Sequence, residues 1–312
     1  MVEYRLLSEL EMPAALRLWV NVFGVEAQFF QTLLDSAESD DFSVGAFDGR
    51  KLVSSVHVFT RRFRDTEGNP NKVGGIGSVS TLPEARSKGH SSRLLQMSIA
   101  EMAARGFQWS YLGTGVNDHY ARHGWRSVST PYFKGTIREP NPSGPIEKAE
   151  VTDALLAEMA IVHGAHTAKT PMANARSKKM WDHAVRYRLT CPPDEVFTSY
   201  EGGKLAAYLV TRQFEDNLQF VESACLVGAE DSLRDLVQGR LGLAASKGMT
   251  KIGCSLAAED PAVQICRSAC PDLQPAEDRA WMVQPIADRI SLPALVSIHA
   301  DPRARRSDLD NF

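Results

Sequence analysis

The chain has 312 residues, of which 43% are hydrophobic and 23% charged, with a formal net charge of -3. This length suits two domains of ordinary size, and the charge excludes the strongly basic surface that nucleic-acid binding requires. No apolar run approaches the roughly 18 residues needed to cross a membrane, and the N-terminus has no signal segment. The sequence therefore predicts a cytoplasmic globular protein without nucleic-acid or membrane partners.

All five cysteines lie in the second half of the chain. Their number is odd, and their spacing matches neither a disulfide framework nor a zinc site. Cys266 and Cys270 are four residues apart, which is one helical turn. We therefore expect reduced thiols and no bound metal.

The first part of the chain alternates between helical and strand-like patterns. Pro13 suits the first turn of a helix, Asp48-Gly49 is a strong hairpin signal, and Gly106 is typical of a helix end. The predicted helices are 13–24, 26–36, 91–105 and 118–123, and the predicted strands are 42–47, 51–63, 73–82, 107–114 and 127–137. The order is therefore two helices, three antiparallel strands, a helix, a strand, a helix and a strand.

Residues 139–145 contain three prolines, which neither a helix nor a central strand tolerates. We place a linker at 139–150, between a domain of residues 1–138 and a second of residues 151–312. The second domain repeats the order of the first, with helices at 152–163, 173–187, 232–247 and 261–270 and strands at 195–200, 205–212, 218–227, 251–255 and 281–285.

The segment from Val79 to Ser91 carries the clearest chemical signal in the sequence. A β-branched run enters Pro83, a basic turn with Gly89 follows, and a helical pattern begins after it. This order places backbone N–H groups at a helix N-terminus, where the helix dipole also favours negative charge. Such a turn can hold a pyrophosphate.

A second motif, Tyr120-Ala121-Arg122-His123-Gly124-Trp125, follows the next strand-like run. The two segments in this order resemble the coenzyme A-binding core of the GCN5-related N-acetyltransferase (GNAT) superfamily. The resemblance implies an α+β fold with two GNAT-like domains in tandem, each a mixed, mostly antiparallel sheet flanked by helices. In this family two central strands splay apart and admit the pantetheine arm.

The resemblance also implies acetyl-CoA, or another acyl-CoA, as co-substrate. Arg86, Gly89 and Ser91 match positions of the family's pyrophosphate turn, although the family usually has glycine or alanine where Ser91 stands. Lys88 and Arg93 are near enough in sequence to meet phosphates, or they are solvated surface bases. The residues expected at the cofactor are Val79, Ser80 and Thr81 through their backbone, the turn of Arg86, Ser87, Lys88, Gly89, His90 and Ser91, and Asn117.

Tyr120 occupies the place at which the family has a tyrosine that protonates the departing thiolate. A phenol with a pKa of about 10 can donate this proton. The alternative is a tyrosine that packs with its hydroxyl at the surface. Asn117, three residues earlier, can bond pantetheine, order the loop or simply cap a helix.

The sequence leaves the general base open. Some relatives use a glutamate on the strand before the turn, but here that stretch reads Gly74-Gly75-Ile76-Gly77-Ser78. The candidates are His119, Glu26, His57, a water chain, and the carboxylate of Phe312 by loose analogy with tandem GNAT enzymes of the enhanced-intracellular-survival type. A lone histidine is often structural, yet His119 is the catalytic candidate that we place beside Tyr120.

The resemblance points to the first two helices for recognition of the acceptor. The candidates there are Trp19, Phe23, Gln28 and Phe29. Most of these aromatic rings are explained more simply as core. An acidic run between Asp35 and Asp41 would suit a polycationic acceptor, and equally a solvated loop.

The second half lacks the chemistry of the first. Its equivalent turn reads Val227-Gly228-Ala229-Glu230-Asp231-Ser232, and two carboxylates would repel a pyrophosphate. The segment Pro261-Ala262-Val263-Gln264-Ile265-Cys266 has no counterpart of Tyr120. We interpret this half as a degenerate copy that packs on the first, with a second active site as the alternative.

The sequence thus predicts an N-acyltransferase that acts on a small-molecule primary amine by direct transfer in a ternary complex. O-acyl transfer would use the same cofactor site, and a non-catalytic acyl-CoA sensor would bind the cofactor without turnover. Acetylation of protein N-termini is a further alternative. The acceptor, the acyl chain length and the oligomeric state, a homodimer included, stay open.

Overall fold

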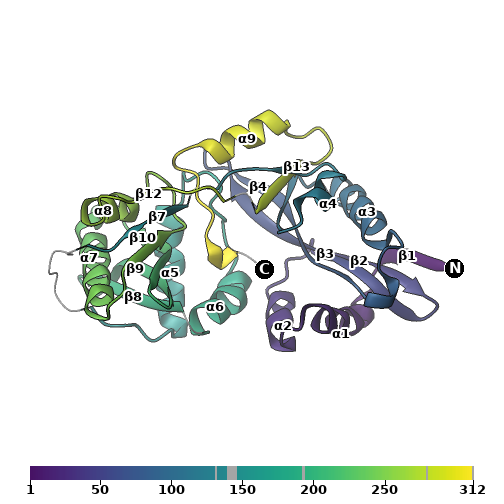
Figure 1. The fold of residues 1–312 in the computed structure, drawn as a ribbon, viewed down its shortest axis with the longest axis horizontal. Helices are drawn as coiled ribbons and strands as arrows, with labels where there is room; N and C mark the ends of the chain where they lie inside the picture. The colour runs from purple at the N-terminus through teal and green to yellow at the C-terminus, as the bar shows by residue number, and fades with distance from the viewer. Residues whose placement is uncertain (131, 139–145, 192–193, 279, 311–312) are drawn as a thin grey trace.

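The computed structural model describes residues 1–130, 132–138, 146–191, 194–278 and 280–310, and it places two β-sheets side by side with helices around them (Figure 1). The first sheet has seven strands in the order β1-β2-β3-β4-β5-β13-β6, and the second has six in the order β12-β7-β11-β10-β9-β8. The pairs β4–β5 and β10–β11 are parallel, and the other pairs are antiparallel. This is the mixed, mostly antiparallel α+β architecture that the sequence predicts.

The first half follows the predicted order of elements closely. Pro13 lies in the first turn of its helix, and Gly24 ends that helix with a left-handed φ of 66°. The elements are β1 (Val2–Leu6), η1 (Glu9–Glu11), α1 (Met12–Phe23), α2 (Ala27–Asp35), β2 (Phe42–Asp48), β3 (Lys51–Arg64), β4 (Pro70–Thr81), η2 (Pro83–Ala85), α3 (His90–Ala104), β5 (Trp109–Gly113), α4 (Asn117–Ala121) and β6 (Arg126–Ser127).

The rest of the chain repeats the meander, helix, strand and helix of the first half and then adds a C-terminal helix. Its elements are β7 (Phe133–Thr136), α5 (Asp153–His166), η3 (Met180–Val185, a π-helical turn), α6 (Arg186–Thr190), β8 (Asp194–Glu201), β9 (Lys204–Phe214), β10 (Asn217–Cys225), α7 (Glu230–Ser246), β11 (Lys251–Cys254), α8 (Pro261–Ala269), β12 (Gln274–Pro275), β13 (Trp281–Pro285), α9 (Leu292–Ala300) and η4 (Asp308–Asp310).

The two halves exchange a strand, which the sequence analysis did not foresee. It assigned 127–137 to the first half and 281–285 to the second. In the structure β13 lies between β5 and β6 in the first sheet, and β7 lies between β11 and β12 in the second. The alternation of apolar residues predicts that a segment is a strand, but it does not say which sheet the strand joins. The assignment of these two strands to their own halves was therefore wrong.

Other elements also differ from the prediction. Strand β1 was missed, although Leu6 and Tyr4 pair with Val44 and Ala46 on β2. The predicted helix at 173–187 is not helical in its first residues, because Asn174 bridges to Phe63 on β3. Helix α9 was also missed, although the Ser291 hydroxyl caps it by accepting from the Ala294 N–H at 3.2 Å.

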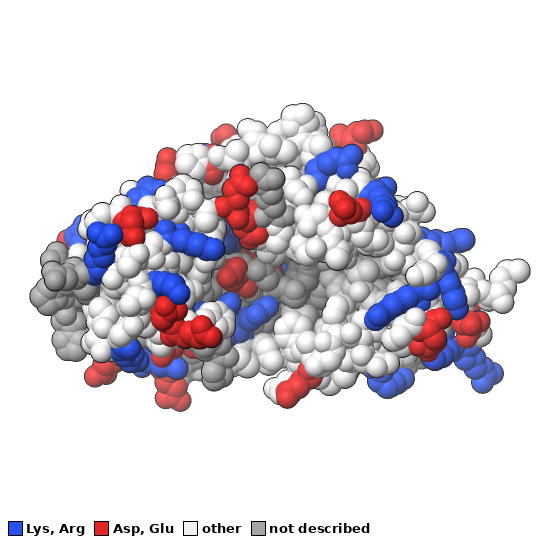
Figure 2. All heavy atoms as spheres, viewed as in Figure 1, with Lys and Arg blue, Asp and Glu red and all other residues white. Residues whose placement is uncertain are grey.

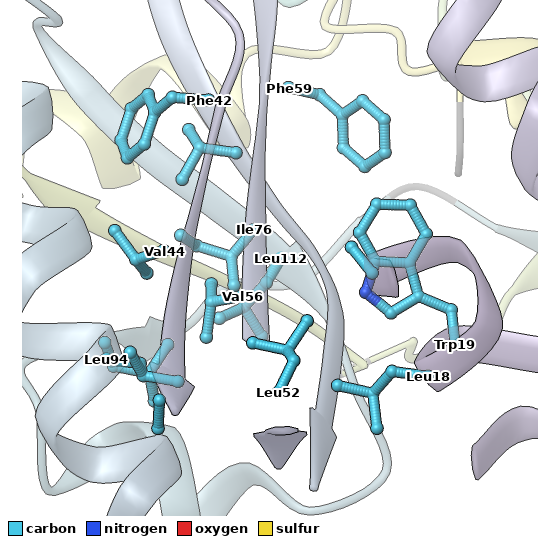
Figure 3. Packing of buried hydrophobic residues seen from close by; sticks show 14 of the residues in the cluster. Leu18, Trp19, Phe42, Val44, Leu52, Val56, Phe59, Ile76, Leu94 and Leu112 are labelled. Atoms are coloured by element: carbon cyan, nitrogen blue, oxygen red, sulfur yellow. The ribbon is translucent and has the colours of Figure 1, made fainter. Parts of the chain in front are cut away.

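The core of the first half lies on both faces of its sheet (Figure 3). Leu18 and Trp19 of α1 cover one face, and Leu94 of α3 belongs to the same buried cluster. A second cluster joins the halves, because it contains Phe63, Trp109, Tyr111 and Val128 together with Met172, Val283 and Leu295. The contact between the halves is therefore itself a hydrophobic core. None of the described helices has the length and apolar character needed to span a membrane.

Buried histidines make this core sensitive to acid. Burial, aided by a nearby arginine, lowers the pKa of His57 to about 3, and the same causes lower the pKa of His299 to about 3. In an unfolded chain these imidazoles titrate near pH ~6.5. Between these values the unfolded state binds more protons, so stability falls as the pH is lowered. Burial raises the pKa of Asp41 to about 6, which acts in the opposite direction.

We expect a drop from pH 7 to pH 5 to cost about 2 kcal/mol of unfolding free energy for each of these two histidines. His299→Leu should remove the part of this loss that is due to His299, because leucine binds no proton in the folded or the unfolded state. Urea unfolding at both pH values measures the difference, and His183→Leu at a half-exposed position is the control. A loss in His299→Leu as large as in the wild type would contradict the assignment.

Candidate active site

Strands β4 and β5 separate beyond a short paired stretch. In the described chain they pair only from Val73 to Gly75 on β4 and from Trp109 to Tyr111 on β5. The β3–β4 register shifts between Ser55 and His57, which leaves one extra residue on β4, and Ser78 there has a φ of 49°. Such a bulge bends the strand and re-aims its backbone groups. Val79, Ser80 and Thr81 therefore have no pairing partner on β5, and we call this unpaired stretch beside the bulge the β4 slot.

A chain of hydrogen bonds supports β4 after the bulge. The Ser54 hydroxyl donates to the Ser80 carbonyl at 2.8 Å and lies 2.8 Å from the Thr81 hydroxyl. The Ser55 and Ser80 hydroxyls are 3.0 Å apart, and Trp19 Nε1 donates to Ser55 at 2.9 Å. Trp19 is fully buried. It therefore belongs to the core and supports β4, which corrects the expectation that its ring meets the acceptor.

The turn between η2 and α3 can bind an anion through its backbone. Ser87 and Gly89 adopt φ values of 62° and 78°, and the first backbone bond of the helix runs from the Arg93 N–H to the Gly89 carbonyl at 3.1 Å. The preceding N–H groups therefore point out of the helix end, where the dipole favours negative charge. A β-carbon on Gly89 would meet no atom within 4 Å, so glycine is needed there for its conformation rather than for space.

A pocket joins this turn to α4. Its lining residues are Thr81, Ala85, Arg86, Ser87, Gly89, His90, Ser91, Ser92, His119 and Arg122. The two sequence motifs thus meet in one place. The guanidinium groups of Arg86 and Arg122 add positive charge to the pocket, and Lys88 is exposed on the same turn. These charges and the backbone N–H groups suit a pyrophosphate.

Two side chains near the turn are engaged elsewhere. His90 is buried, and its Nδ1 lies 2.7 Å from the Tyr4 hydroxyl. The Arg93 guanidinium lies over the Tyr4 ring, 4.3 Å from its centroid. His90 can therefore serve a phosphate only through its backbone, and Arg93 packs on β1. Tyr4 was not among the predicted site residues, because no pattern in the sequence predicted strand β1, which carries it.

Tyr120 lies on α4 with its ring partly buried against Trp125, at 6.2 Å between centroids. Burial raises the pKa of its phenol. The hydroxyl is therefore protonated at neutral pH, which is the state that a general acid requires.

His119 lines the pocket beside Tyr120. Burial, and then the nearby Arg122 guanidinium, lower the pKa of His119. The imidazole is therefore neutral at pH 7 and able to accept a proton. His123, 5.6 Å from the His119 ring, places its Nε2 3.2 Å from the Ser92 hydroxyl and so links α4 to α3.

Asn117 orders the loop around α4. Its side-chain amide donates to the Ser127 hydroxyl on β6 at 2.9 Å. This is one of the roles that the sequence left open for it. Contact with pantetheine stays a prediction.

The other acceptor candidates occupy different surroundings. Phe23 has 46% of its surface exposed near the end of α1, and Gln28 is exposed on α2. The Phe29 ring lies 6.1 Å from the ring of Tyr187 on α6, and the Arg188 guanidinium lies 5.9 Å from it. Phe29 therefore contributes to the contact between the halves. The molecular surface is recessed where the two halves meet, on the face shown in Figure 2.

The remaining base candidates do not converge on the slot. Glu26 is exposed at the N-cap of α2. His57 is buried, its low pKa keeps it neutral, and its Nδ1 lies 2.7 Å from the Ser43 hydroxyl. Phe312 lies outside the described residues.

The second half has a comparable slot, but side chains fill it. The pairing of β10 with β11 ends at Phe220, and β10 is bulged between Phe220 and Glu222. Glu222 is fully buried there, and Arg176 donates to its two oxygens at 3.0 Å and 2.6 Å. The Tyr208 hydroxyl donates to the same carboxylate at 2.7 Å.

The C-terminal segment completes this filling. Arg305 Nη1 donates to the Ser223 carbonyl on β10 at 2.7 Å and lies 3.3 Å from the Asp260 carboxylate. Asp310 accepts from Arg176 Nε at 2.7 Å. The Ser223 carbonyl is therefore bonded to a side chain of the C-terminal segment. No local pattern predicts these contacts, because they join residues far apart in the chain.

Comparison with known proteins agrees with this architecture. Residues 3–128 match the family model of the acetyltransferase (GNAT) domain. A conserved protein of unknown function from Enterococcus faecalis V583 is 19% identical, with a TM-score of 0.72 over 92% of this chain and 73% of that one. A GCN5-related N-acetyltransferase from Anabaena variabilis is 14% identical, with a TM-score of 0.67 over 92% and 73%. Eis1 from Mycobacterium abscessus is 16% identical, with a TM-score of 0.67 over 92% and 74%. No curated protein gave a significant match.

The fold and the family domain define an acyltransferase of the class EC 2.3.1. At these identities the solved structures show the fold alone, and that likeness extends across both halves. Residues 3–128 are therefore a GNAT domain, and the members of that family use an acyl-CoA as co-substrate.

Proposed function

We propose that the protein transfers the acyl group of an acyl-CoA, with acetyl-CoA as the expected donor, to a primary amine of a small molecule. The observation that carries this proposal is the meeting of the β4 slot, the turn before α3 and the helix of Tyr120 in one place. This transfer needs a turn that binds the pyrophosphate and backbone groups on β4 that are not paired with β5. It also needs a protonated phenol as general acid.

We assign the acyl-CoA site to residues 1–138, completed by β13, with 139–150 as the linker and 151–312 as a degenerate half. The filled slot around Glu222 and the acidic turn at Glu230 and Asp231 support one cofactor per chain. Within the site, the turn from Arg86 to Ser91 holds the pyrophosphate, and the backbone of Val79 to Thr81 pairs with pantetheine and polarises the thioester carbonyl.

Transfer then occurs directly between the two bound substrates. The neutral amine nitrogen attacks the carbonyl carbon of the thioester, and a C–N bond forms. As the C–S bond breaks, Tyr120 gives its phenolic proton to the departing thiolate. The nitrogen loses its extra proton to a base, for which neutral His119 is the candidate, or to water. The products are an amide and the free thiol of coenzyme A.

A non-catalytic acyl-CoA sensor is the second candidate function. One observation favours it, because β4 carries no carboxylate that could serve as the base. The two functions are separated by release of coenzyme A from acetyl-CoA in the presence of a panel of amines and alcohols, read by mass spectrometry. Release that requires an amine supports N-acyl transfer, release that requires an alcohol supports O-acyl transfer, and binding without any release supports the sensor.

Arg86→Glu is expected to weaken acetyl-CoA binding at least tenfold at low salt, or by about 1.4 kcal/mol or more. The change replaces a cation beside the turn with an anion that repels the pyrophosphate. Isothermal titration calorimetry measures the dissociation constant, and Lys247→Glu supplies the same charge change at an exposed position in the other half. Equal weakening in both variants would remove Arg86 from the site.

A further inference from the structure

A second hollow lies under α1 and α2, away from the pocket at the start of α3. Its volume is about 1010 Å³, a size that holds a small molecule. Its lining residues are Leu6, Leu7, Ser8, Glu9, Met12, Pro13, Leu16, Gln31, Leu34, Asp35, Ala37, Glu38, Ser39, Asp41, Phe42, Ser43, His57, Arg105 and Lys179. None of these lines the pocket that joins the α3 turn to α4.

The lining of this hollow is partly apolar, and its charges are mainly negative. Met12 and Leu16 of α1, Leu34 of α2 and Phe42 of β2 form the apolar part of its lining. Four carboxylates line it, from Glu9, Asp35, Glu38 and Asp41.

Both cations of the lining are already engaged. Arg105 Nε donates to Glu101 at 2.7 Å, and the Arg105 guanidinium lies over Phe42 at 4.5 Å from its centroid. Lys179 Nζ donates to the Ala37 carbonyl at 3.3 Å. The negative charge of the lining is therefore only partly compensated, and a cation on an apolar body complements it.

The lining at the start of β2 contains two buried polar groups, each with one atom that has no hydrogen-bond partner among the described residues. His57 is only 3% exposed, its Nδ1 is engaged by Ser43, and its Nε2 has no hydrogen-bond partner in the described part of the chain. Asp41 accepts from the Thr60 N–H through one oxygen, and its other oxygen has no partner there either. Buried polar atoms are normally bonded, so an exception calls for an explanation. Burial raises the pKa of Asp41 and lowers that of His57, and the nearby Arg61 guanidinium lowers both.

We propose that this hollow is a second ligand site, separate from the acyl-CoA pocket, for a primary amine on an aliphatic chain. The aliphatic chain lies between α1, α2 and Phe42. The ammonium group faces the carboxylates of Asp35, Glu38 and Asp41. It donates to the free oxygen of Asp41 and, in the tautomer of His57 that is protonated at Nδ1, to His57 Nε2. This inference does not depend on the proposed function, because it uses no residue of the transfer site.

The test uses the full chain with saturating coenzyme A and no acyl donor, so that no transfer consumes the ligand. Octylamine, octanoate and ethylamine are titrated at pH 7 by calorimetry. Octylamine should bind at least tenfold more tightly than the other two, because octanoate has the wrong charge and ethylamine lacks the chain. Equal binding of octanoate, or no binding of octylamine, would overturn the proposal.

Two variants locate the site. The double variant Asp35→Asn with Glu38→Gln changes only side chains that are exposed or half-buried, and it should weaken octylamine at least tenfold while leaving coenzyme A affinity unchanged. Tyr120→Phe should leave octylamine binding unchanged. Unaltered affinity in the double variant would overturn the proposal, as would displacement of octylamine by coenzyme A. Failure of the proposed function would appear separately, as absent turnover in the panel of amines.

Discussion

Tyr120→Phe will lower kcat by about 100-fold or more, because a positioned general acid contributes roughly that factor. The dissociation constant of acetyl-CoA should change less than about twofold, since phenylalanine keeps the ring that packs against Trp125. The wild-type rate should also fall at alkaline pH, above the pKa of Tyr120, which burial raises. The rate of the variant should show no such fall at alkaline pH.

Initial rates of coenzyme A release across pH, with calorimetry for binding, check this result. Tyr200→Phe is the matched control, because it removes a hydroxyl that donates to Glu158 at 3.2 Å on the surface of the other half. An unchanged kcat in Tyr120→Phe would remove the residue from proton transfer. A loss of acetyl-CoA affinity as large as the loss in kcat would assign it to binding instead.

Local signals determine the parts of the fold that the sequence predicted. Pro13 and Gly24 bound α1, Gly49 has a φ of 59° in the β2–β3 hairpin, and Gly106 has a φ of 77° just after α3. Each of these residues acts on its own stretch of backbone, so a sequence is enough to place it. The anion-binding turn belongs to the same group, because its chemistry lies in the backbone at a helix start.

The parts that the sequence missed depend on partners far away in the chain. Strands β7 and β13 both have recognisable patterns, but their exchange depends on which sheet buries Phe133 and which buries Val283. The support of β4 by Ser54, Ser55 and Trp19 depends on register. Likewise, the filling of the second slot by Arg305 links residues 82 positions apart. Pairing energies of this kind are set by tertiary packing and not by local propensity.

A chain that ends at residue 150 will show no cooperative unfolding transition. It lacks β13, which pairs with β5 along five residues from Trp281 to Pro285. Trp109 and Tyr111, which are buried in the shared cluster, would lose partners there. Exposing two such rings costs up to about 4 kcal/mol each, which together is comparable to the whole stability of a typical domain. Circular dichroism with urea measures the transition.

A matched chain shows whether β13 is the cause. Thr130 and Asp278 form an isolated antiparallel bridge, so a short glycine-serine linker can join residues 1–130 directly to 277–304. This chain restores β13 between β5 and β6 and omits the second sheet, and it should regain a cooperative transition and acetyl-CoA binding. If the chain of residues 1–150 unfolded cooperatively by itself, each half would hold its sheet without the exchanged strand. We expect the opposite outcome, because β13 lies inside the first sheet but follows the strands β7 to β12 of the second sheet in the sequence.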